Sequence, residues 1–298
     1  MEVAKSRVLP DGTAVHYRLA RAEEPRGLIV LLHGMASNLT RWSEFVEHTA
    51  LRRTWDIMRP DLRGHGLSLV RGRIGMEVWS ADLADLLDAE GREQAVLIGH
   101  SLGAHLALLF AARFPARVPG LVLIDPVFPQ ALSGGRRWLR LARPLFGMAA
   151  AAIRFFNALG IRRRHFPQRD LRALDEAVRA ELLAAGDSRE FVRRYSSVLA
   201  DIKYFPVSHY VQEVAEMLRP LPALSSLPAP ILVLLSRGLT HTDPTRMEHL
   251  LDASANVERV TIDAYHWPLT ERPEEVRRAV ETWIGERLCT PSKTPERR

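Results

Sequence analysis

The residues best suited to chemistry lie in a short stretch, residues 99–103, that reads Gly-His-Ser-Leu-Gly. An apolar run at 95–98 precedes it, and a helix-compatible run at 102–110 follows it. A G-x-S-x-G sequence between a strand and a helix is typical of a nucleophile elbow. In that motif a tight, strained turn exposes the serine Oγ at the tip of the strand. We therefore predict that Ser101 is a nucleophile.

A serine hydroxyl is a poor nucleophile at neutral pH, so it needs a base within hydrogen-bond reach and an acid that orients the base. We expect His266 to be the base, because it lies in the loop between the last strand and the last helix that we predict. His241 is a weaker alternative. We expect His33 and His65 to shape their loops, and we expect the side chain of His100 to point away from the reacting centre.

The negative oxygen that forms during acyl transfer needs two preorganised hydrogen-bond donors. One should be the backbone N–H of Leu102, the residue after the nucleophile. The other should come from the loop after the apolar run 28–32, where we expect the N–H of Met35 to act. Gly34 would let that backbone turn close to the site.

Strand-like and helix-like segments alternate over the first 126 residues and again after residue 228. Such alternation favours a parallel sheet covered by helices on both faces. The predicted strands are 13–19, 28–32, 55–58, 95–98, 121–124, 231–235 and 257–262. The predicted helices in these two regions are 77–87, 102–114, 244–251 and 273–288.

The middle segment, 127–228, interrupts the alternation and contains no convincing strand. Its periodicity predicts helices over 137–141, 146–159, 171–184, 190–199 and 208–217. At the end of the chain, 289–298 forms a polar tail.

Four motifs carry a resemblance to a known family. They are Leu-His-Gly at 32–34, Asp-Leu-Arg-Gly-His-Gly at 61–66, the elbow at 99–103, and Tyr-His-Trp-Pro at 265–268. In this order they resemble the α/β-hydrolase fold superfamily. The resemblance implies an α/β fold with an eight-stranded, mostly parallel sheet flanked by helices. It also implies a serine–acid–histidine triad in that chain order and a helical cap inserted after the sixth strand.

On this basis we expect residues 1–126 and 229–288 to form the core and 127–228 to form the cap. The resemblance leaves two candidates for the acid. Asp243 follows the seventh predicted strand, but it comes later than the family pattern places its acid, and it is also a favoured N-cap for a helix that begins at Pro244. Asp125 follows the sixth strand, where some members of the superfamily carry theirs.

The serine argues against epoxide hydrolase and haloalkane dehalogenase chemistry, for which the superfamily uses aspartate at the elbow. With serine at the elbow, the resemblance implies a carboxylic ester hydrolase that works through an acyl-enzyme. The aromatic and aliphatic residues of 127–228 suggest an apolar pocket, so we expect fairly apolar, small or medium acyl esters as substrates. Two alternatives are a carbon–carbon bond hydrolase or lactonase with the same triad, and a non-catalytic binding module. We expect no metal or organic cofactor, because the P-loop and dinucleotide-binding glycine patterns are absent.

The composition is that of an ordinary globular protein. The chain has 298 residues, of which 47% are hydrophobic and 26% charged. A single cysteine, Cys289, excludes a disulfide within the chain and a cysteine-based zinc site. We find no signal peptide and no confident membrane span, so we expect a cytoplasmic protein.

The net charge of +6 is unevenly distributed along the chain. Residues 131–169 contain nine arginines and no acidic residue. We find no nucleic-acid motif, so we expect either a solvated arginine-rich face or a lid over an apolar cleft. The mixture of arginine with aromatic and aliphatic residues would also suit a weak contact with an anionic membrane surface.

Overall fold

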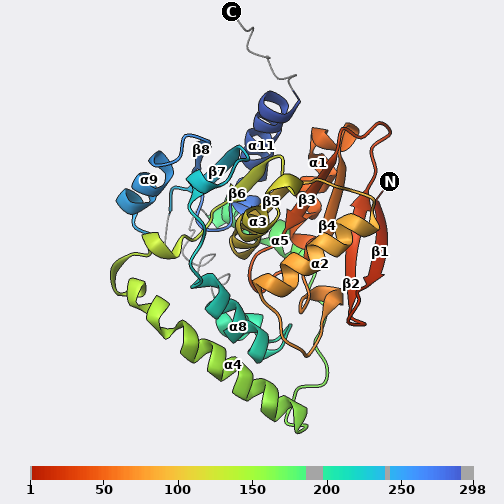
Figure 1. Cartoon of the computed structure of the whole chain (residues 1–298), viewed down its shortest axis with the longest axis vertical. Coiled ribbons are helices and arrows are strands. Elements are labelled where there is room, and N and C mark those ends of the chain that lie inside the picture. The colour runs from red at the N-terminus through yellow and green to blue at the C-terminus, as the bar shows by residue number, and fades with distance from the viewer. Residues whose placement is uncertain (1, 186–196, 239–241, 290–298) are drawn as a thin grey trace, which may run out of the picture.

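The strands of the protein form one mixed sheet. The computed structural model describes residues 2–185, 197–238 and 242–289, and in these residues the sheet has eight strands in the order β1-β2-β4-β3-β5-β6-β7-β8 (Figure 1). β2 runs antiparallel to both of its neighbours, and the other neighbouring pairs are parallel. The strands are β1 Glu2–Val8, β2 Ala14–Ala20, β3 Leu28–Leu32, β4 Asp56–Pro60, β5 Val96–His100, β6 Leu121–Ile124, β7 Ile231–Ser236 and β8 Val257–Ile262.

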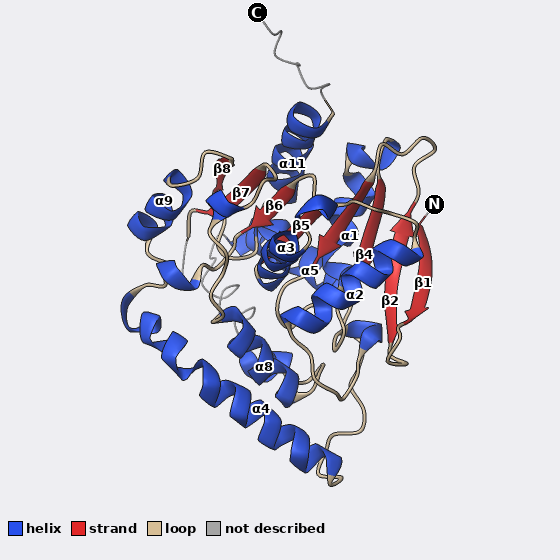
Figure 2. Cartoon of the chain, viewed as in Figure 1, coloured by secondary structure: helices blue, strands red, loops and turns tan. Residues whose placement is uncertain are grey.

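Helices cover both faces of this sheet (Figure 2). Outside the segment between β6 and β7, the α-helices are α1 Ser43–His48, α2 Met76–Ala89, α3 Leu102–Arg113, α9 Pro244–Asp252, α10 Pro268–Glu271 and α11 Pro273–Leu288. Short 3-10 helices are η1 Leu39–Trp42, η2 Ala50–Arg53, η3 Gly66–Ser68 and η4 Pro115–Arg117.

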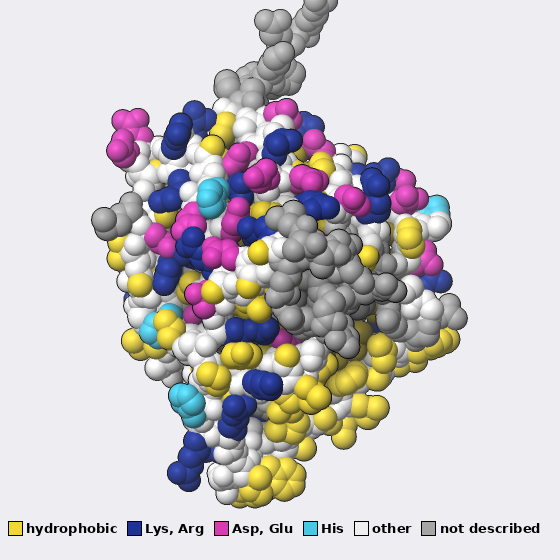
Figure 3. Space-filling model, turned by 180° about the vertical axis from the view of Figure 1, so that it is seen from behind, with side chains coloured by type: hydrophobic (Ala, Val, Ile, Leu, Met, Phe, Trp, Pro, Cys, Tyr) yellow, Lys and Arg dark blue, Asp and Glu magenta, His cyan; other side chains and the backbone are white. Residues whose placement is uncertain are grey.

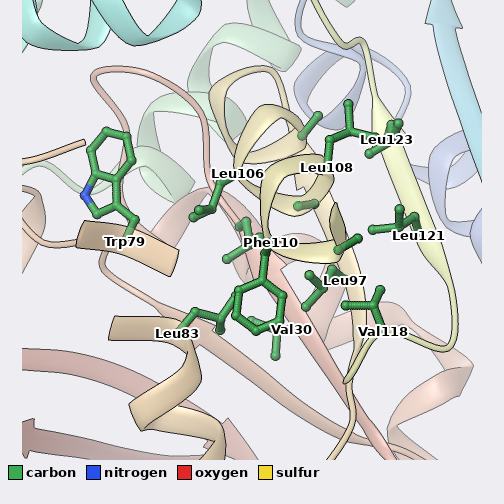
Figure 4. Packing of buried hydrophobic residues seen from close by; sticks show 14 of the residues in the cluster. Val30, Trp79, Leu83, Leu97, Leu106, Leu108, Phe110, Val118, Leu121 and Leu123 are labelled. Atoms are coloured by element: carbon green, nitrogen blue, oxygen red, sulfur yellow. The ribbon is translucent and has the colours of Figure 1, made fainter. Parts of the chain in front are cut away.

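The central strands are apolar throughout because both of their faces are buried. Successive side chains of a strand point to opposite faces. Val30 and Leu32 therefore pack with α2 and α3, whereas Ile29 and Leu31 pack with α1 and α11. Figure 4 shows the first of these two clusters, in which Phe110 of α3 lies against strand residues.

Between β6 and β7 the described residues form helices, turns and loops, with a single isolated bridge from Leu132 to Thr242. The helices are η5 Pro129–Ala131, η6 Gly134–Ala142, α4 Arg143–Ala158, α5 Leu171–Ala185, α7 Val198–Asp201, α8 Val207–Met217 and η7 Leu224–Ser226. α8 contacts α3 of the core, and α4 packs on the outer side of α8 (Figure 1). That 127–228 is a separate cap domain stays a prediction.

The predicted fold class is confirmed, and several elements have the predicted bounds. These are the strands 28–32, 121–124 and 257–262 and the helix 273–288. The segment 137–141 lies in a 3-10 helix rather than an α-helix. Most of the predicted helix 190–199, and the tail after Cys289, lie outside the described residues. None of the described helices is both long and apolar enough to cross a membrane.

Among the described strands and α-helices, one strand and two short helices were not predicted individually. β1 has no clear apolar pattern, because most of its side chains are exposed and several are polar. This is expected of an edge strand that pairs only with β2. α1 and α10 are only six and four residues long, which is too short for a clear helical period.

The turn from β5 into α3 requires glycine on both sides of Ser101. A Cβ on Gly99 would lie 2.3 Å from the carbonyl oxygen of Gly103, and a Cβ on Gly103 would lie 2.2 Å from the carbonyl oxygen of Leu32. Both obstacles are backbone atoms, which cannot rotate away as a side chain can. The two glycines therefore allow α3 to start directly against the ends of β3 and β5.

We expect Gly103→Ala to lower the free energy of unfolding by about 3 kcal/mol or more, because the added methyl forces α3 away from β3. The matched control is Gly285→Ala in α11, where a Cβ would meet nothing within 4 Å. That change should raise stability by up to about 1 kcal/mol through helix propensity. Urea unfolding of the two variants measures both effects. Equal stability of Gly103→Ala and the parent protein would contradict this reading of the turn.

Candidate active site

Ser101 lies at the tip of β5 in a strained backbone conformation. Its φ of 52° and ψ of −112° are rare for a residue with a side chain. Its N–H donates to the carbonyl of Ile124 at 3.0 Å, and its own carbonyl accepts from Ala104 N–H at 3.0 Å. These bonds join the turn to β6 on one side and to α3 on the other. The turn has the features of the predicted elbow.

His266 lies between Ser101 and a carboxylate. Its Nε2 is 3.0 Å from the Oγ of Ser101, and its Nδ1 is 2.5 Å from Oδ2 of Asp125. With Nδ1–H donating to Asp125, Nε2 presents a lone pair to the serine hydroxyl. His266 follows β8, Ser101 follows β5 and Asp125 follows β6. The fold therefore brings together three loops that are separate in sequence.

Asp125 is oriented by the sheet itself. Its backbone has a φ of 46°, and its N–H donates to the carbonyl of Leu234 at 2.8 Å. Its Oδ1 accepts from Ser236 N–H at 3.0 Å, which leaves Oδ2 for His266. The carboxylate is almost fully buried. Both of its oxygens are therefore used, and its position is fixed by β7.

The structure brings Asp125, rather than Asp243, to His266. Asp243 is the N-cap of α9, where its Oδ1 accepts from Arg246 N–H at 3.1 Å. This is the alternative structural role that the sequence suggested for it. His241, the weaker candidate base, lies outside the described residues.

The two predicted oxyanion donors are available. A Cβ on Gly34 would lie 3.4 Å from the Cβ of Ser101, so the loop after β3 runs directly beside the serine. Within the described part of the chain, neither the N–H of Met35 nor that of Leu102 has a hydrogen-bond acceptor. Leu102 is also the first residue of α3, where the helix dipole favours negative charge.

Glu213 of α8 holds the loop that carries Met35, and we did not single it out from the sequence. The next residue, Ala36, has a φ of 52°, and its N–H donates to Oε2 of Glu213 at 3.1 Å. The other oxygen, Oε1, contacts Nε2 of His65. Burial lowers the pKa of His65, but the adjacent Glu213 carboxylate outweighs burial and raises it. Both side chains are buried, so this contact lies inside the protein.

A signal for Glu213 was present in the sequence. The predicted helix 208–217 carries polar side chains at helical spacing, at positions 209, 212, 213 and 216. All four are buried against the core rather than exposed. For example, Gln212 donates to the carbonyl of Ile74. Such a stripe indicates a helix that binds polar loops through side chains.

His33 and His100 hydrogen-bond to neighbouring loops, and neither contacts Ser101 as a base. The expectation that the His100 side chain points away from the reacting centre was wrong: its ring centroid lies 5.3 Å from that of His266, because the imidazole reaches across to the loop after β8. Nε2 of His33 accepts from Leu62 N–H at 3.1 Å, and its Nδ1–H donates to the Gly34 carbonyl at 2.9 Å. His100 Nε2–H donates to the carbonyl of His266 at 2.9 Å. Burial and the proximity of His266 lower the pKa of His100 to about 3, which keeps its imidazole neutral.

A cavity of about 380 Å³ adjoins Ser101 and His266. Its apolar lining comes from core loops and from the segment between β6 and β7: Met35, Val127, Leu132, Leu139, Phe146, Val214, Met217, Leu218 and Trp267. Five further polar side chains, Ser37, Arg41, His100, Asp201 and Tyr210, also reach it. Arg41 is paired with Asp175 and donates to Thr270 Oγ1 at 2.9 Å.

Asp201 is the titratable carboxyl in this lining. Burial raises the pKa of Asp201 to about 6, although Arg169, whose Nη1 lies 3.0 Å from Oδ1, works in the opposite direction. The cavity lining is mostly apolar, and the two charged side chains in its polar region are each paired: Arg41 with Asp175 and Asp201 with Arg169.

Known proteins with similar sequences include two hydrolases. A 102-residue stretch is 38% identical to 2-hydroxy-6-oxo-2,4-heptadienoate hydrolase of Pseudomonas putida, covering 33% of this chain and 37% of that protein. A 108-residue stretch is 34% identical to the lipase LipV of Mycobacterium tuberculosis, covering 36% of this chain and 40% of that protein. This chain thus matches less than half of the length of either relative.

The fold is shared more widely. A hydrolase from Pseudomonas aeruginosa has a solved structure that superposes with a TM-score of 0.68, over 95% of this chain and 98% of that one, at 24% identity. A sequence profile of the alpha/beta hydrolase family matches residues 29–279, which include the elbow, the histidine loop and the sheet that joins them. The chain therefore belongs to the alpha/beta hydrolase family.

Proposed function

We propose that this protein hydrolyses carboxylic esters through an acyl-enzyme on Ser101. The observation that carries the proposal is the continuous hydrogen-bonded chain from Asp125 through His266 to the Ser101 hydroxyl, at the wall of a mostly apolar cavity. This arrangement supplies a nucleophile, a base and an orienting acid in the geometry that acyl transfer needs.

In the first half of the reaction, Ser101 Oγ attacks the ester carbonyl while its proton passes to His266 Nε2. Asp125 accepts the Nδ1–H bond throughout and stabilises the imidazolium that forms. The carbonyl oxygen becomes an oxyanion between the N–H groups of Met35 and Leu102. When the tetrahedral intermediate collapses, the C–O bond breaks, and the alcohol leaves with the proton from His266.

In the second half, water attacks the acyl carbonyl and gives a proton to His266. The same two amides stabilise the second oxyanion. The acid product then leaves, and Ser101 recovers its proton from the imidazole. Besides the ester and water, the proposed cycle uses the side chains of Ser101, His266 and Asp125 and the amides of Met35 and Leu102.

The cavity favours fairly apolar, small or medium esters as substrates. Its apolar lining would bind an acyl or alcohol chain through desolvation, and about 380 Å³ is near the small end of typical ligand pockets. The likeness to a lipase supports ester cleavage, although it covers only part of both chains.

A second candidate is cleavage of a carbon–carbon bond in a vinylogous diketone, or lactone opening, by the same three residues. One observation favours it: the likeness to the heptadienoate hydrolase, which covers about a third of each chain. A third candidate is a binding module that uses the cavity without turnover.

Ser101→Ala should abolish ester hydrolysis, lowering kcat by at least about 10³-fold because the nucleophile is lost. The measurement is a series of p-nitrophenyl esters of increasing acyl length with both proteins. We expect the highest kcat/KM on apolar chains of short to medium length. Best turnover on charged, hydrophilic esters would contradict the assignment of the cavity. No turnover of any ester would favour the second or third candidate.

Asp125→Asn should lower kcat by about 10⁴-fold, because an amide facing Nδ1 favours the wrong tautomer of His266. Asp243→Asn is a matched control with the same chemical change. Asparagine caps helices as well as aspartate does, so its activity and stability should stay close to those of the parent. Steady-state kinetics of the two variants compare them directly, and the reverse ranking would assign the acid to Asp243.

Glu213→Ala should lower kcat by about 10-fold to 100-fold per active serine with little change in KM, because the Met35 amide loses its fixed position. Titration of active serine with a phosphonate removes the contribution of misfolded protein. Affinity for a trifluoromethyl ketone should fall in parallel, because its bound form carries the oxyanion. Glu213→Gln, which can still accept from Ala36 N–H, should retain most of the rate. Equal kcat in Glu213→Ala and the parent would refute a positioning role.

A further inference from the structure

One surface of the protein carries an unusual concentration of exposed apolar side chains. Nine large hydrophobic residues along η6, α4 and the turn that follows are between 44% and 72% exposed. They are Trp138, Leu139, Leu141, Leu145, Met148, Phe155, Phe156, Leu159 and Ile161. We call this surface the α4 face. Figure 3 shows hydrophobic side chains gathered along the lower part of the molecule, where α4 lies in Figure 1.

The α4 face is an organised stripe. Leu145, Met148, Phe155 and Leu159 recur at steps of three, seven and four residues, which places them on one side of the helix. The opposite side of α4 already packs on α8: Ala150 is buried, and Arg154 Nη1 donates to Gln212 Oε1 at 2.7 Å. The stripe is therefore not needed to fix the helix to the protein.

Soluble proteins rarely expose contiguous apolar surface of this kind without a partner for it. The charges around the stripe indicate which partner fits. Residues 131–169 contain nine arginines and no acidic residue. Arg140 precedes the helix and Arg162 and Arg164 follow it, and all three are exposed. The apolar stripe is thus flanked by cations at both ends.

The combination matches an anionic lipid surface. Acyl chains accept the apolar side chains, and each arginine near a negatively charged membrane adds an attraction to the anionic headgroups. A second copy of this chain fits less well. If the α4 face met itself, arginines would face arginines, with no acid between residues 131 and 169 to compensate.

The α4 face is also continuous with the cavity at Ser101. Leu139 is 44% exposed and at the same time lines that cavity, as does Phe146 from the first turns of α4. The apolar surface therefore passes from the outside of the protein into the wall of the candidate active site.

From these observations we propose that the α4 face docks reversibly on anionic membranes. The docking does not depend on the proposed catalytic function, because the stripe residues Leu145, Met148 and Phe155 lie outside the lining of the Ser101 cavity. In the docked state the wall of the cavity that Leu139 forms lies next to the lipid.

The test is flotation of the full-length protein with vesicles on a density gradient. One set of vesicles is phosphatidylcholine alone, and the other contains about 30 mol% phosphatidylglycerol. We expect at least about ten-fold more protein to float with the anionic vesicles at about 50 mM salt, and most of that binding to be lost at about 500 mM salt. Equal flotation with both sets, or none with either, would overturn the proposal.

Two sets of substitutions locate the binding surface. The variant Leu145→Gln, Met148→Gln, Phe155→Gln should lose at least about ten-fold of its binding to anionic vesicles, because the stripe can no longer enter the lipid. The control Val8→Gln, Leu67→Gln removes apolar side chains that are equally exposed on other elements, and it should bind as the parent does. The proposal would be overturned if the control lost its binding to anionic vesicles, or if the α4 variant retained it.

Light scattering of both proteins separates docking from self-association. We expect the parent and the α4 variant to have the same mass in solution without vesicles. A parent dimer that dissociates in the α4 variant, together with failure to float, would assign the face to a second copy of the chain. The rate on a soluble ester should be similar in parent and α4 variant, since none of the three substituted residues lines the cavity.

Discussion

The hydrogen bond between Nδ1 of His266 and Oδ2 of Asp125 is the interaction on which the rest of the site depends. It fixes the tautomer of the imidazole and so decides whether Nε2 can take a proton from Ser101. The two residues are 141 positions apart in sequence. They meet only because parallel pairing aligns β5, β6, β7 and β8 so that their carboxyl ends share one edge.

Two helices between β6 and β7 contribute to the surroundings of this edge of the sheet. α8 faces the core with a buried polar stripe, through which Glu213 reaches both Ala36 and His65. A buried carboxylate is costly unless it is fully paired, so this contact strongly restrains how α8 can sit on the core. α4 in turn packs on α8 and carries the exposed apolar stripe. The geometry beside Met35 and the position of the exposed stripe thus depend on the same pair of helices.

The sequence allowed much of this architecture to be predicted. Ser101 and His266 could be chosen as candidates because each lies in a short motif whose local context, a strand, a turn and then a helix, can be recognised from apolar runs. The candidate acid could not be chosen, because both Asp125 and Asp243 follow a strand, and only tertiary distances distinguish a carboxylate that reaches His266 from an N-cap. Glu213 was missed for a related reason: a polar stripe on a helix reads as a solvated face until the fold buries it.

The central claim, that Ser101 becomes acylated, is tested most directly by mass spectrometry of the intact protein mixed rapidly with an activated ester. The account predicts that one acyl group is added per chain, that a peptide containing Ser101 carries it, and that it disappears as the substrate is consumed. It predicts no such adduct in Ser101→Ala. Hydrolysis without any adduct, or an adduct on another residue that turns over at the catalytic rate, would contradict it.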